Sequence, residues 1–204
     1  MNSGATADRV YDGLKRQLLS GDVAPAGKLE PGPIAADLSS SVTPVRDALH
    51  RLIGEQLVET RSGEGFYAPH VSEPALRDLY GWNLDLLAFV LRAQHRPFPP
   101  PPPRHDGGRN TLAGETAAIF ARLARGSDNE EHWRAIESAS DRLQVARIAE
   151  GRVFDDLGAE LDGLKAMLEA DDKAALRRLL TRYHRRRQRA TAMIVRAIYR
   201  DRAA

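Results

Sequence analysis

The sequence SSVTPVRDAL at residues 40–49 has the pattern of a short helix with one apolar face and one polar face. Small polar side chains satisfy the free N–H groups at a helix start and proline is tolerated in the first turn, so we expect the helix to begin beside Ser41. The apolar positions that recur on one side are Val45, Ala48, Leu49, Leu52 and Ile53. On the other side, Thr43, Arg46 and His50 are spaced i, i+3 and i+7, and they therefore project together. A hydroxyl and a guanidinium near the N-terminal turn of a packed helix are typical of a helix that reads phosphates and base edges in DNA.

The flanking sequence predicts the rest of a winged helix-turn-helix domain. Upstream, residues 34–38 (IAADL) form a second short apolar pattern. The polar residues 39–41 separate it from the helix that begins beside Ser41. Two short helices joined by a tight polar turn form a helix-turn-helix. Downstream, residues 56–61 and 66–68 alternate like strands on either side of Ser62-Gly63-Glu64-Gly65, which predicts a β-hairpin, the wing.

Residues 8–70 resemble the DNA-binding domain of the GntR family of bacterial transcription regulators, and the FadR-type branch of that family fits best. The stretches that carry the resemblance are VYDGL at 10–14, LSGDVAPAGKL at 19–29, TPVRDAL at 43–49, Leu57-Val58, Gly63 and Gly65. Each stretch is short, and the resemblance rests on their order and spacing. It implies a regulator that binds operator DNA.

The polar helix face and the resemblance together indicate which residues contact DNA. These residues are Ser41, Thr43, Arg46, His50, Arg51, Glu64 and Gly65. Val42 stands where members of the family carry a DNA-contacting arginine, which implies a shifted operator preference or weaker binding. Ser39-Ser40 replaces a Gly-Val pair of the family, so we expect a slightly looser turn, and Gln56 replaces a glycine at the helix end.

Composition and the absence of certain sequence patterns argue against a disulfide-bonded protein, a membrane protein and an enzyme. The chain has 204 residues, 42% of them hydrophobic, and a formal net charge of +2, which suits two ordinary domains and is compatible with DNA binding. The absence of cysteine excludes disulfides, thiolate catalysis and cysteine-based zinc sites. No apolar run is long enough to cross a membrane and residues 1–6 lack an apolar signal region, so we expect a cytoplasmic protein. No Ser/His/Asp set, phosphate-binding loop or paired carboxylates indicate catalysis, and we expect no enzyme.

We expect two domains, a winged helix-turn-helix at 1–72 and an all-helical effector-binding and dimerisation domain at 73–204, and therefore a mostly α fold. Apolar periodicity in the second domain predicts about five helices. They lie at 73–94, at 111–125, from a cap at Asp128 to Gly151, at 153–170, and from a cap at Asp171-Asp172 to near residue 200. The proline-rich segment 97–103 separates the first two. Consecutive prolines form a stiff polyproline II rod, which either spaces the helices or is bound by a partner.

The helical bundle resembles the FCD effector domain of the FadR-type branch. Many FCD domains hold a metal ion through an Asp and a His four residues apart, plus two later His. Carried onto this sequence, the first pair falls near Ser140 and Gln144, or at Asp141 with no His behind it, and the two later positions fall near Leu161 and His184. Only the last matches, so the ligand set looks incomplete, and we expect no metal and no other cofactor. A metal held by a rearranged set would use His132, Asp141 and His184.

Five residues are candidates for binding a small-molecule effector, namely His132, Trp133, Gln144, His184 and Arg187. Each has a structural alternative, since a lone histidine on a helix is more often a surface or hydrogen-bonded residue. The arginines in the run 184–189 lie on a solvated helix face, bind a carboxylate in a pocket, or form a second nucleic-acid patch. Tyr80 and Trp82 are core or dimer contacts, or else part of a ligand cage.

The sequence therefore predicts a one-component transcription regulator. It binds double-stranded operator DNA as a homodimer, because one recognition helix covers too few base pairs for useful specificity. A small-molecule effector shifts operator affinity only by binding one arrangement of the two winged helices better than another. The alternative hypothesis is a helical adaptor whose winged helix binds protein. A steep salt dependence of DNA retention separates the two.

Overall fold

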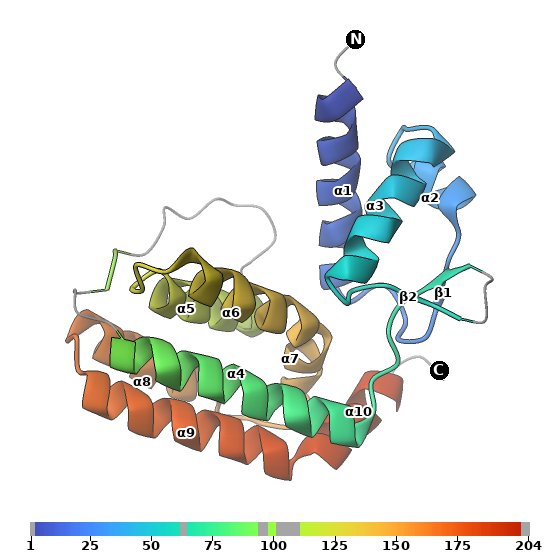
Figure 1. The fold of residues 1–204 in the computed structure, drawn as a ribbon. Helices are drawn as coiled ribbons and strands as arrows, with labels where there is room; N and C mark the ends of the chain where they lie inside the picture. Colours follow the sequence, from blue (N-terminus) through green and yellow to red (C-terminus); the bar gives the residue numbers. More distant parts are fainter. Residues whose placement is uncertain (1–2, 62–64, 94–97, 101–110, 201–204) are drawn as a thin grey trace. The chain divides into compact units, whose positions relative to one another are not determined.

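The computed structural model describes residues 3–61, 65–93, 98–100 and 111–200. The chain divides into two compact units, Met1–Val71 and Ser72–Ala204, each with its own apolar core. The fold is mostly α with a small antiparallel sheet in the first unit, as the sequence predicts (Figure 1). No helix of the described residues is long and apolar enough to cross a membrane.

The first unit is a winged helix-turn-helix, which confirms the fold expected from its sequence. Its helices are α1 (Ser3–Leu19), α2 (Pro31–Asp37) and α3 (Val42–Gly54). Both α1 and α2 pack against α3. The apolar stripe of α3 enters the shared core, where Val45, Leu49 and Leu52 have no exposed surface. Burying each such side chain stabilises the fold by about 1.5–3 kcal/mol, which holds α3 with its polar face outward.

The wing contains one strand more than the sequence predicts. Strands β2 (Glu59–Thr60) and β3 (Phe66–Tyr67) form the expected hairpin. Strand β1 (Lys28–Leu29) pairs antiparallel with the other edge of β3, with Leu29 opposite Phe66, and the strand order is β1-β3-β2. A strand of two residues carries no alternation from which it can be predicted. This third strand connects the wing, through backbone pairing, to the segment that precedes α2.

Helices α2 and α3 both end in a tight bonding pattern that usually requires glycine. After α2, the N–H of Ser40 donates to the carbonyl of Ala35 at 2.9 Å, and the equivalent bond after α3 is 3.0 Å long. This pattern places the residue before the donor in the left-handed region, where Ser39 has φ 48° and Gln56 has φ 60°. These are two positions at which the chain departs from the glycine of the family pattern.

Ser39→Gly and Gln56→Gly should each stabilise the first unit by about 1 kcal/mol. A residue with a Cβ is strained by roughly 1–2 kcal/mol in this region, and the larger entropy of unfolded glycine cancels only part of that gain. Chemical denaturation of the full chain, followed by circular dichroism, measures the change. Ser41→Gly is the matched control, because Ser41 has φ −88° and no strain to relieve. An equal gain at Ser41 would contradict the explanation.

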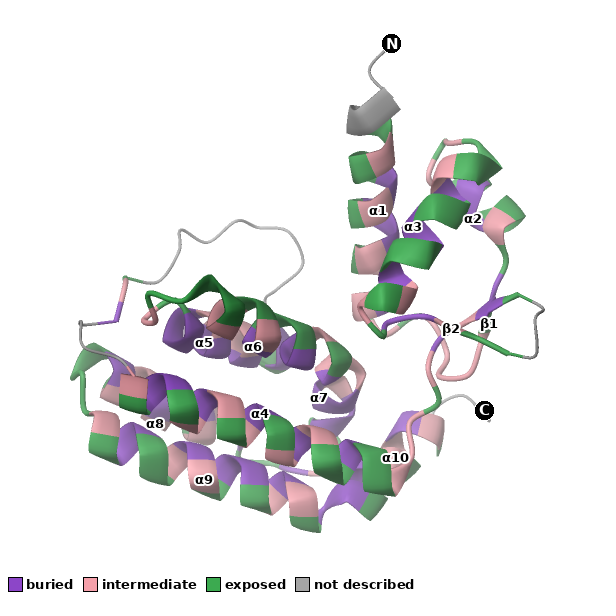
Figure 2. Cartoon of the chain, viewed as in Figure 1, coloured by how far each residue is buried: buried purple, intermediate pink, exposed green. Residues whose placement is uncertain are grey.

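The second unit is an all-helical bundle, drawn green to red in Figure 1. Its helices are α4 (Glu73–Ala93), α5 (Leu112–Ala124), α6 (Glu130–Arg142), α7 (Gln144–Glu150), α8 (Leu157–Glu169), α9 (Lys173–Arg189) and α10 (Thr191–Arg200). The long helices α4 and α9 lie side by side, α8 packs along α9, and α5 packs against α6. Buried and exposed segments alternate along these helices, so each buries one stripe in the core (Figure 2).

The bundle has seven helices among the described residues, whereas the sequence predicts about five, because two long apolar patterns are each broken once. Leu143 interrupts the first pattern, between α6 and α7. Ala190 interrupts the second, between α9 and α10. Beside that break, the carbonyl of Gln188 accepts hydrogen bonds from the side chains of Arg77 and Thr191. Apolar periodicity continues through both breaks, so it could not reveal them.

Two helix starts also differ from the prediction, and one is confirmed. The cap of α6 is Asn129, whose side chain accepts from an N–H of the first turn at 2.9 Å, and not Asp128. Helix α8 begins at Leu157 rather than at Val153. The cap at Asp172 is confirmed, since its carboxylate accepts from an N–H of the first turn of α9 at 2.8 Å.

The proline-rich segment 97–103 is described only at residues 98–100. Phe98 is buried in the bundle core, and the carbonyl of Pro99 accepts from Arg122 at 2.6 Å. This part of the segment therefore packs on the bundle. The rest lies outside the described residues, so the choice between a spacer and a partner-binding rod stays a prediction.

Candidate functional site

The polar face of α3 presents the three residues that the sequence places together. Thr43, Arg46 and His50 are all exposed, whereas Val45, Leu49 and Leu52 of the same helix are buried. Among the described residues of the first unit, Arg46 takes part in none of the ion pairs. Its guanidinium is therefore available to an anion from outside the chain, and it lies near the N-terminal turn, where the free N–H groups of α3 also favour negative charge.

Two of the residues of α3 that were expected to contact DNA, His50 and Arg51, have contacts within the first unit. The ring of His50 meets the edge of Phe66 at 5.1 Å, so the wing holds this exposed side chain in place. Arg51 stacks 3.7 Å from the ring centre of Tyr11 in α1 and lies 3.4 Å from Asp8. Arg51 thus faces α1 and not the side of Arg46. Ser41 caps α3 without a side-chain hydrogen bond and is exposed.

The wing adds charged groups beside α3 that the sequence did not single out. Arg61 pairs with Glu59 at 2.8 Å and lies 4.9 Å over the ring of Tyr67. Lys28 of β1 is exposed and 3.3 Å from Glu30. The pairing of β1 with β3 is what brings this lysine to the wing, and no local sequence pattern predicts that pairing.

Two residues of the wing turn, Glu64 and Gly65, were predicted to contact DNA, and the structure describes Gly65. Gly65 has φ +85°, in the region that glycine adopts without strain. A Cβ at this position would make only ordinary van der Waals contacts, with the side chains of Tyr67 and Lys28, so the backbone angle is what favours glycine. Glu64 lies outside the described residues.

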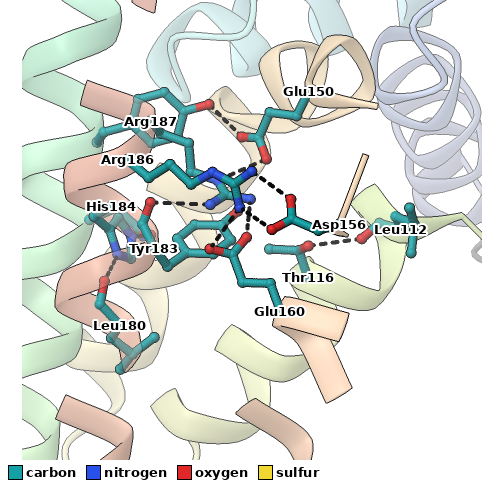
Figure 3. A network of polar contacts seen from close by, with 12 residues as sticks. Leu112, Thr116, Glu150, Asp156, Glu160, Leu180, Tyr183, His184, Arg186 and Arg187 are labelled. Carbon is teal, nitrogen blue, oxygen red and sulfur yellow. Dashed lines mark hydrogen bonds and ion pairs between the residues drawn. The ribbon is translucent and has the colours of Figure 1, made fainter. Parts of the chain in front are cut away.

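Arg187, an expected effector ligand, lies at the centre of a buried ion network in the second unit (Figure 3). It is 1% exposed, its Nε lies 2.9 Å from Glu150 and its Nη2 lies 2.7 Å from Glu160. The guanidinium also stacks on the ring of Tyr183 at 3.3 Å, and Tyr80 donates its hydroxyl to Glu150. Burial opposes the charge, but Tyr183 and the two carboxylates outweigh it and raise the pKa of Arg187. Arg187 is already neutralised by groups of its own chain.

His184, the second expected ligand on α9, is fully buried. Its Nδ1 lies 2.7 Å from the carbonyl of Leu180 and its Nε2 lies 2.9 Å from the side chain of Asn83. Its ring stacks against Phe120 at 5.6 Å. Burial lowers the pKa of His184 to about 3, and the nearby cation Arg187 adds to the shift. The imidazole is therefore neutral at ordinary pH.

This shift predicts that the second unit loses stability in acid. The unfolded histidine takes up a proton below its ordinary pKa of 6.5, whereas the folded one does not until about pH 3. Full stability is therefore present above pH 6.5 and falls as the pH is lowered toward 3, by up to about 1.4 kcal/mol per pH unit. Thermal melts of the parent and of His184→Gln between pH 7 and 4 should converge as the pH falls. Parallel curves would contradict this assignment.

The remaining expected effector ligands lie on α6 and α7. His132 is partly buried, its Nδ1 lies 2.7 Å from Ser127 Oγ, and its ring meets the edge of Phe89 at 4.9 Å. Trp133 packs against the bundle core, and Gln144 is partly exposed. The structure joins none of these three to His184 through a hydrogen bond or ring contact among the described residues.

The positions that correspond to the metal ligands of FCD domains do not fit a metal. Within the described residues, no group of three His, Cys, Asp or Glu side chains is arranged to hold one, so His132, Asp141 and His184 do not converge. The hydroxyl of Ser140 accepts from Arg147 at 2.7 Å, and Leu161 is an apolar core residue.

The buried polar groups of the bundle include several that the sequence interpretation missed. Arg147 and Glu150 are both 2% exposed, and they lie on α7 among the buried residues Ala146 and Ala149. Charged residues at positions that the helical period assigns to the core were the available signal. Buried charges of this kind are retained where they are paired or functional.

Comparison with known proteins agrees with the geometry of the first unit. Residues 6–68 match the family model described as bacterial regulatory proteins, gntR family. The chain is 30% identical over 89 residues to the HTH-type transcriptional regulator McbR of Escherichia coli (strain K12), a match that covers 43% of this chain and 40% of McbR. It is 30% identical over 138 residues to the Nta operon transcriptional regulator of Aminobacter aminovorans, covering 60% of this chain and 64% of that protein. The matches thus span less than two thirds of either relative.

Solved structures share the complete fold. A structure of E. coli McbR/YncC covers 95% of this chain and 99% of its own, with a TM-score of 0.64 and 19% identity. A GntR transcriptional regulator from Rhodococcus sp. RHA1 covers the same shares, with a TM-score of 0.71 and 18% identity. At these identities the likeness concerns the fold, which both structures continue through the helical bundle.

Proposed function

Because residues 6–68 belong to the gntR family of bacterial regulatory proteins, we propose that the chain is a transcription regulator that binds operator DNA through α3 and the wing. The observation that carries this proposal is the exposed face of Thr43, Arg46 and His50 on a helix whose other side is locked in the core. A rigid helix with a free guanidinium near its first turn suits the major groove, where arginine bonds phosphate or pairs with guanine.

The proposal includes a homodimer and a small-molecule effector. One α3 reaches only a few base pairs, so useful specificity requires two copies on two half-sites. We assign dimerisation and effector binding to the second unit. An effector acts by favouring one spacing of the two α3 helices over another. The curated relatives are named as regulators, which favours this function over catalysis.

The experiment is selection of bound fragments from the source genome, followed by titration of the selected duplex at several salt concentrations. Phosphate binding releases counterions, so the logarithm of the affinity should fall steeply and linearly with the logarithm of salt concentration. An adaptor that binds protein through its winged helix would select no sequence and show no such slope. Either of those results would refute DNA-binding regulation.

A further inference from the structure

A row of four exposed arginines runs along α9 on the surface of the second unit. Arg178, Arg182, Arg185 and Arg189 are spaced i, i+4, i+7 and i+11, so they lie on one face of the helix. At the rise of an α-helix the row is roughly 16 Å long. Helix α9 contains eight basic residues and no acidic one. Since the whole chain has a formal net charge of +2, the residues outside α9 together carry −6, and the positive charge is concentrated on this helix.

The nearby carboxylates are already used by two other arginines of α9. Arg187 holds Glu150 and Glu160 in the core, and Arg186 holds Asp156. The ion pairs that α9 makes with the described part of the chain include no member of the exposed row. The four guanidinium groups of the row are therefore available to an anion from outside the chain.

The row is not explained by the stability of the helix. Like charges at these spacings repel each other and destabilise a helix. The dipole of α9 favours cations in the last turn, which accounts for Arg189. It does not account for Arg178 and Arg182, which lie more than one turn before the end of the helix. A row of cations that costs stability indicates a partner that neutralises it.

All four arginines of the row line one groove of about 640 Å³, which we call the arginine groove. Arg186 also lines it, stacked 4.3 Å from the ring centre of Phe154, and no acidic residue is among the described residues that line it. Interfaces between proteins are depleted of charge at their centre, whereas interfaces with DNA are more polar and much more positively charged. The lining of this groove has the composition of the second kind.

We propose that the arginine groove binds the phosphate backbone of duplex DNA without reading its sequence. A guanidinium bonds two phosphate oxygens through parallel N–H groups, and cations in a row suit an extended polyanion better than a compact one. Contacts with the backbone carry no sequence information, so the groove adds affinity for any duplex. The choice of DNA as the polyanion rests on the proposed function, whereas the affinity for an extended row of phosphates does not.

The test is binding of the full-length protein to a duplex of arbitrary sequence at several salt concentrations. Each neutralised phosphate contributes about −0.9 to the slope of the logarithm of affinity against the logarithm of salt concentration. Arg182→Gln combined with Arg185→Gln removes two cations, so the slope should become shallower by about 1.8 per chain, and affinity near 0.1 M salt should fall at least about tenfold. Lysine at both positions keeps the charges and should keep the slope.

Arg177→Gln combined with Arg196→Gln is the matched control. Both arginines are exposed, neither takes part in the ion pairs of the described helices α9 and α10, and neither lines the groove. This control removes the same charge and should leave the slope unchanged. Thermal melts should show the groove variant at or above the parent Tm, because a repulsion has been removed.

Three results would overturn the proposal. In the first, the groove variant and the control change the slope equally, or neither changes it. In the second, polyglutamate binds the parent more tightly than the duplex at equal salt, which makes the partner an acidic protein. In the third, the groove variant has a different oligomeric state from the parent in sedimentation, which makes the groove an interface between copies of the chain.

Arg46→Ala separates this inference from the proposed function. That variant should lose affinity for the selected operator more than for the arbitrary duplex, whereas the groove variant should lower both by the same factor. A protein that selects no operator but whose salt slope depends on the groove refutes the proposed function and leaves the groove standing. A selected operator that binds with a slope unaffected by the groove variant does the reverse.

Discussion

Replacing Arg187 by leucine should lower the free energy of unfolding of the second unit by about 3–5 kcal/mol, because it leaves the buried carboxylate of Glu150 without its cation. Glu150 is 2% exposed and depends on Arg187 and the Tyr80 hydroxyl for its hydrogen bonds. Glu160 is paired on the same guanidinium. Denaturant and thermal unfolding of the full chain, read from the tryptophan fluorescence of the second unit, measure the loss.

Arg186→Leu is the matched control for this prediction. Arg186 is the neighbouring arginine and pairs with Asp156 and, at 3.8 Å, with Glu160. Its side chain is 32% exposed, so its loss should cost less than about 1 kcal/mol. Adding Glu150→Gln to Arg187→Leu should recover part of the loss, since it removes the unmatched charge. If Arg187→Leu costs no more than Arg186→Leu, the network does not stabilise the bundle as described.

The first unit was largely predictable because its signals are local. The apolar stripe of α3 falls on one helical face, and each of its central positions is fully buried. Ser39 and Gln56, where the sequence departs from a glycine pattern, are positions of positive φ. Strand β1 could not be predicted, because its partner β3 lies far along the chain and because a strand of two residues shows no alternation of apolar and polar positions.

The buried charges of the second unit were harder to predict, because a charged residue on a helix is usually solvated. The arginine run 184–189 was open to three interpretations. The structure divides it by the helical period, with His184 and Arg187 buried and Arg185 and Arg189 exposed. Which cation finds a carboxylate depends on residues from other helices, and sequence spacing carries no information on that pairing. For the same reason Arg147 was overlooked, although it lies among the buried residues of α7.

Arg46→Ala should weaken operator binding by at least about tenfold while leaving the fold intact. The guanidinium is exposed and has no ion-pair partner among the described residues of its unit, so its removal breaks no contact that holds α3 in place. A phosphate bond or a bidentate contact with guanine is worth roughly 1–3 kcal/mol, and a dimer loses it twice. Titration of labelled operator at fixed salt measures the loss, and thermal melts of the same samples check the fold.

Variants at neighbouring positions show whether the effect belongs to this face of α3. Arg51→Ala removes the same charge from the same helix, but its guanidinium is stacked on Tyr11, so operator affinity should fall less. Val42→Arg should tighten binding, because Val42 is 41% exposed beside the first turn and a cation there adds one phosphate contact per half-site. Gly65→Val should weaken binding by straining the wing at φ +85°.

If Arg46→Ala binds like the parent while Arg51→Ala does not, the side of α3 that faces α1 reads the operator. If neither changes the affinity, α3 does not read DNA and the protein-binding adaptor becomes the better hypothesis.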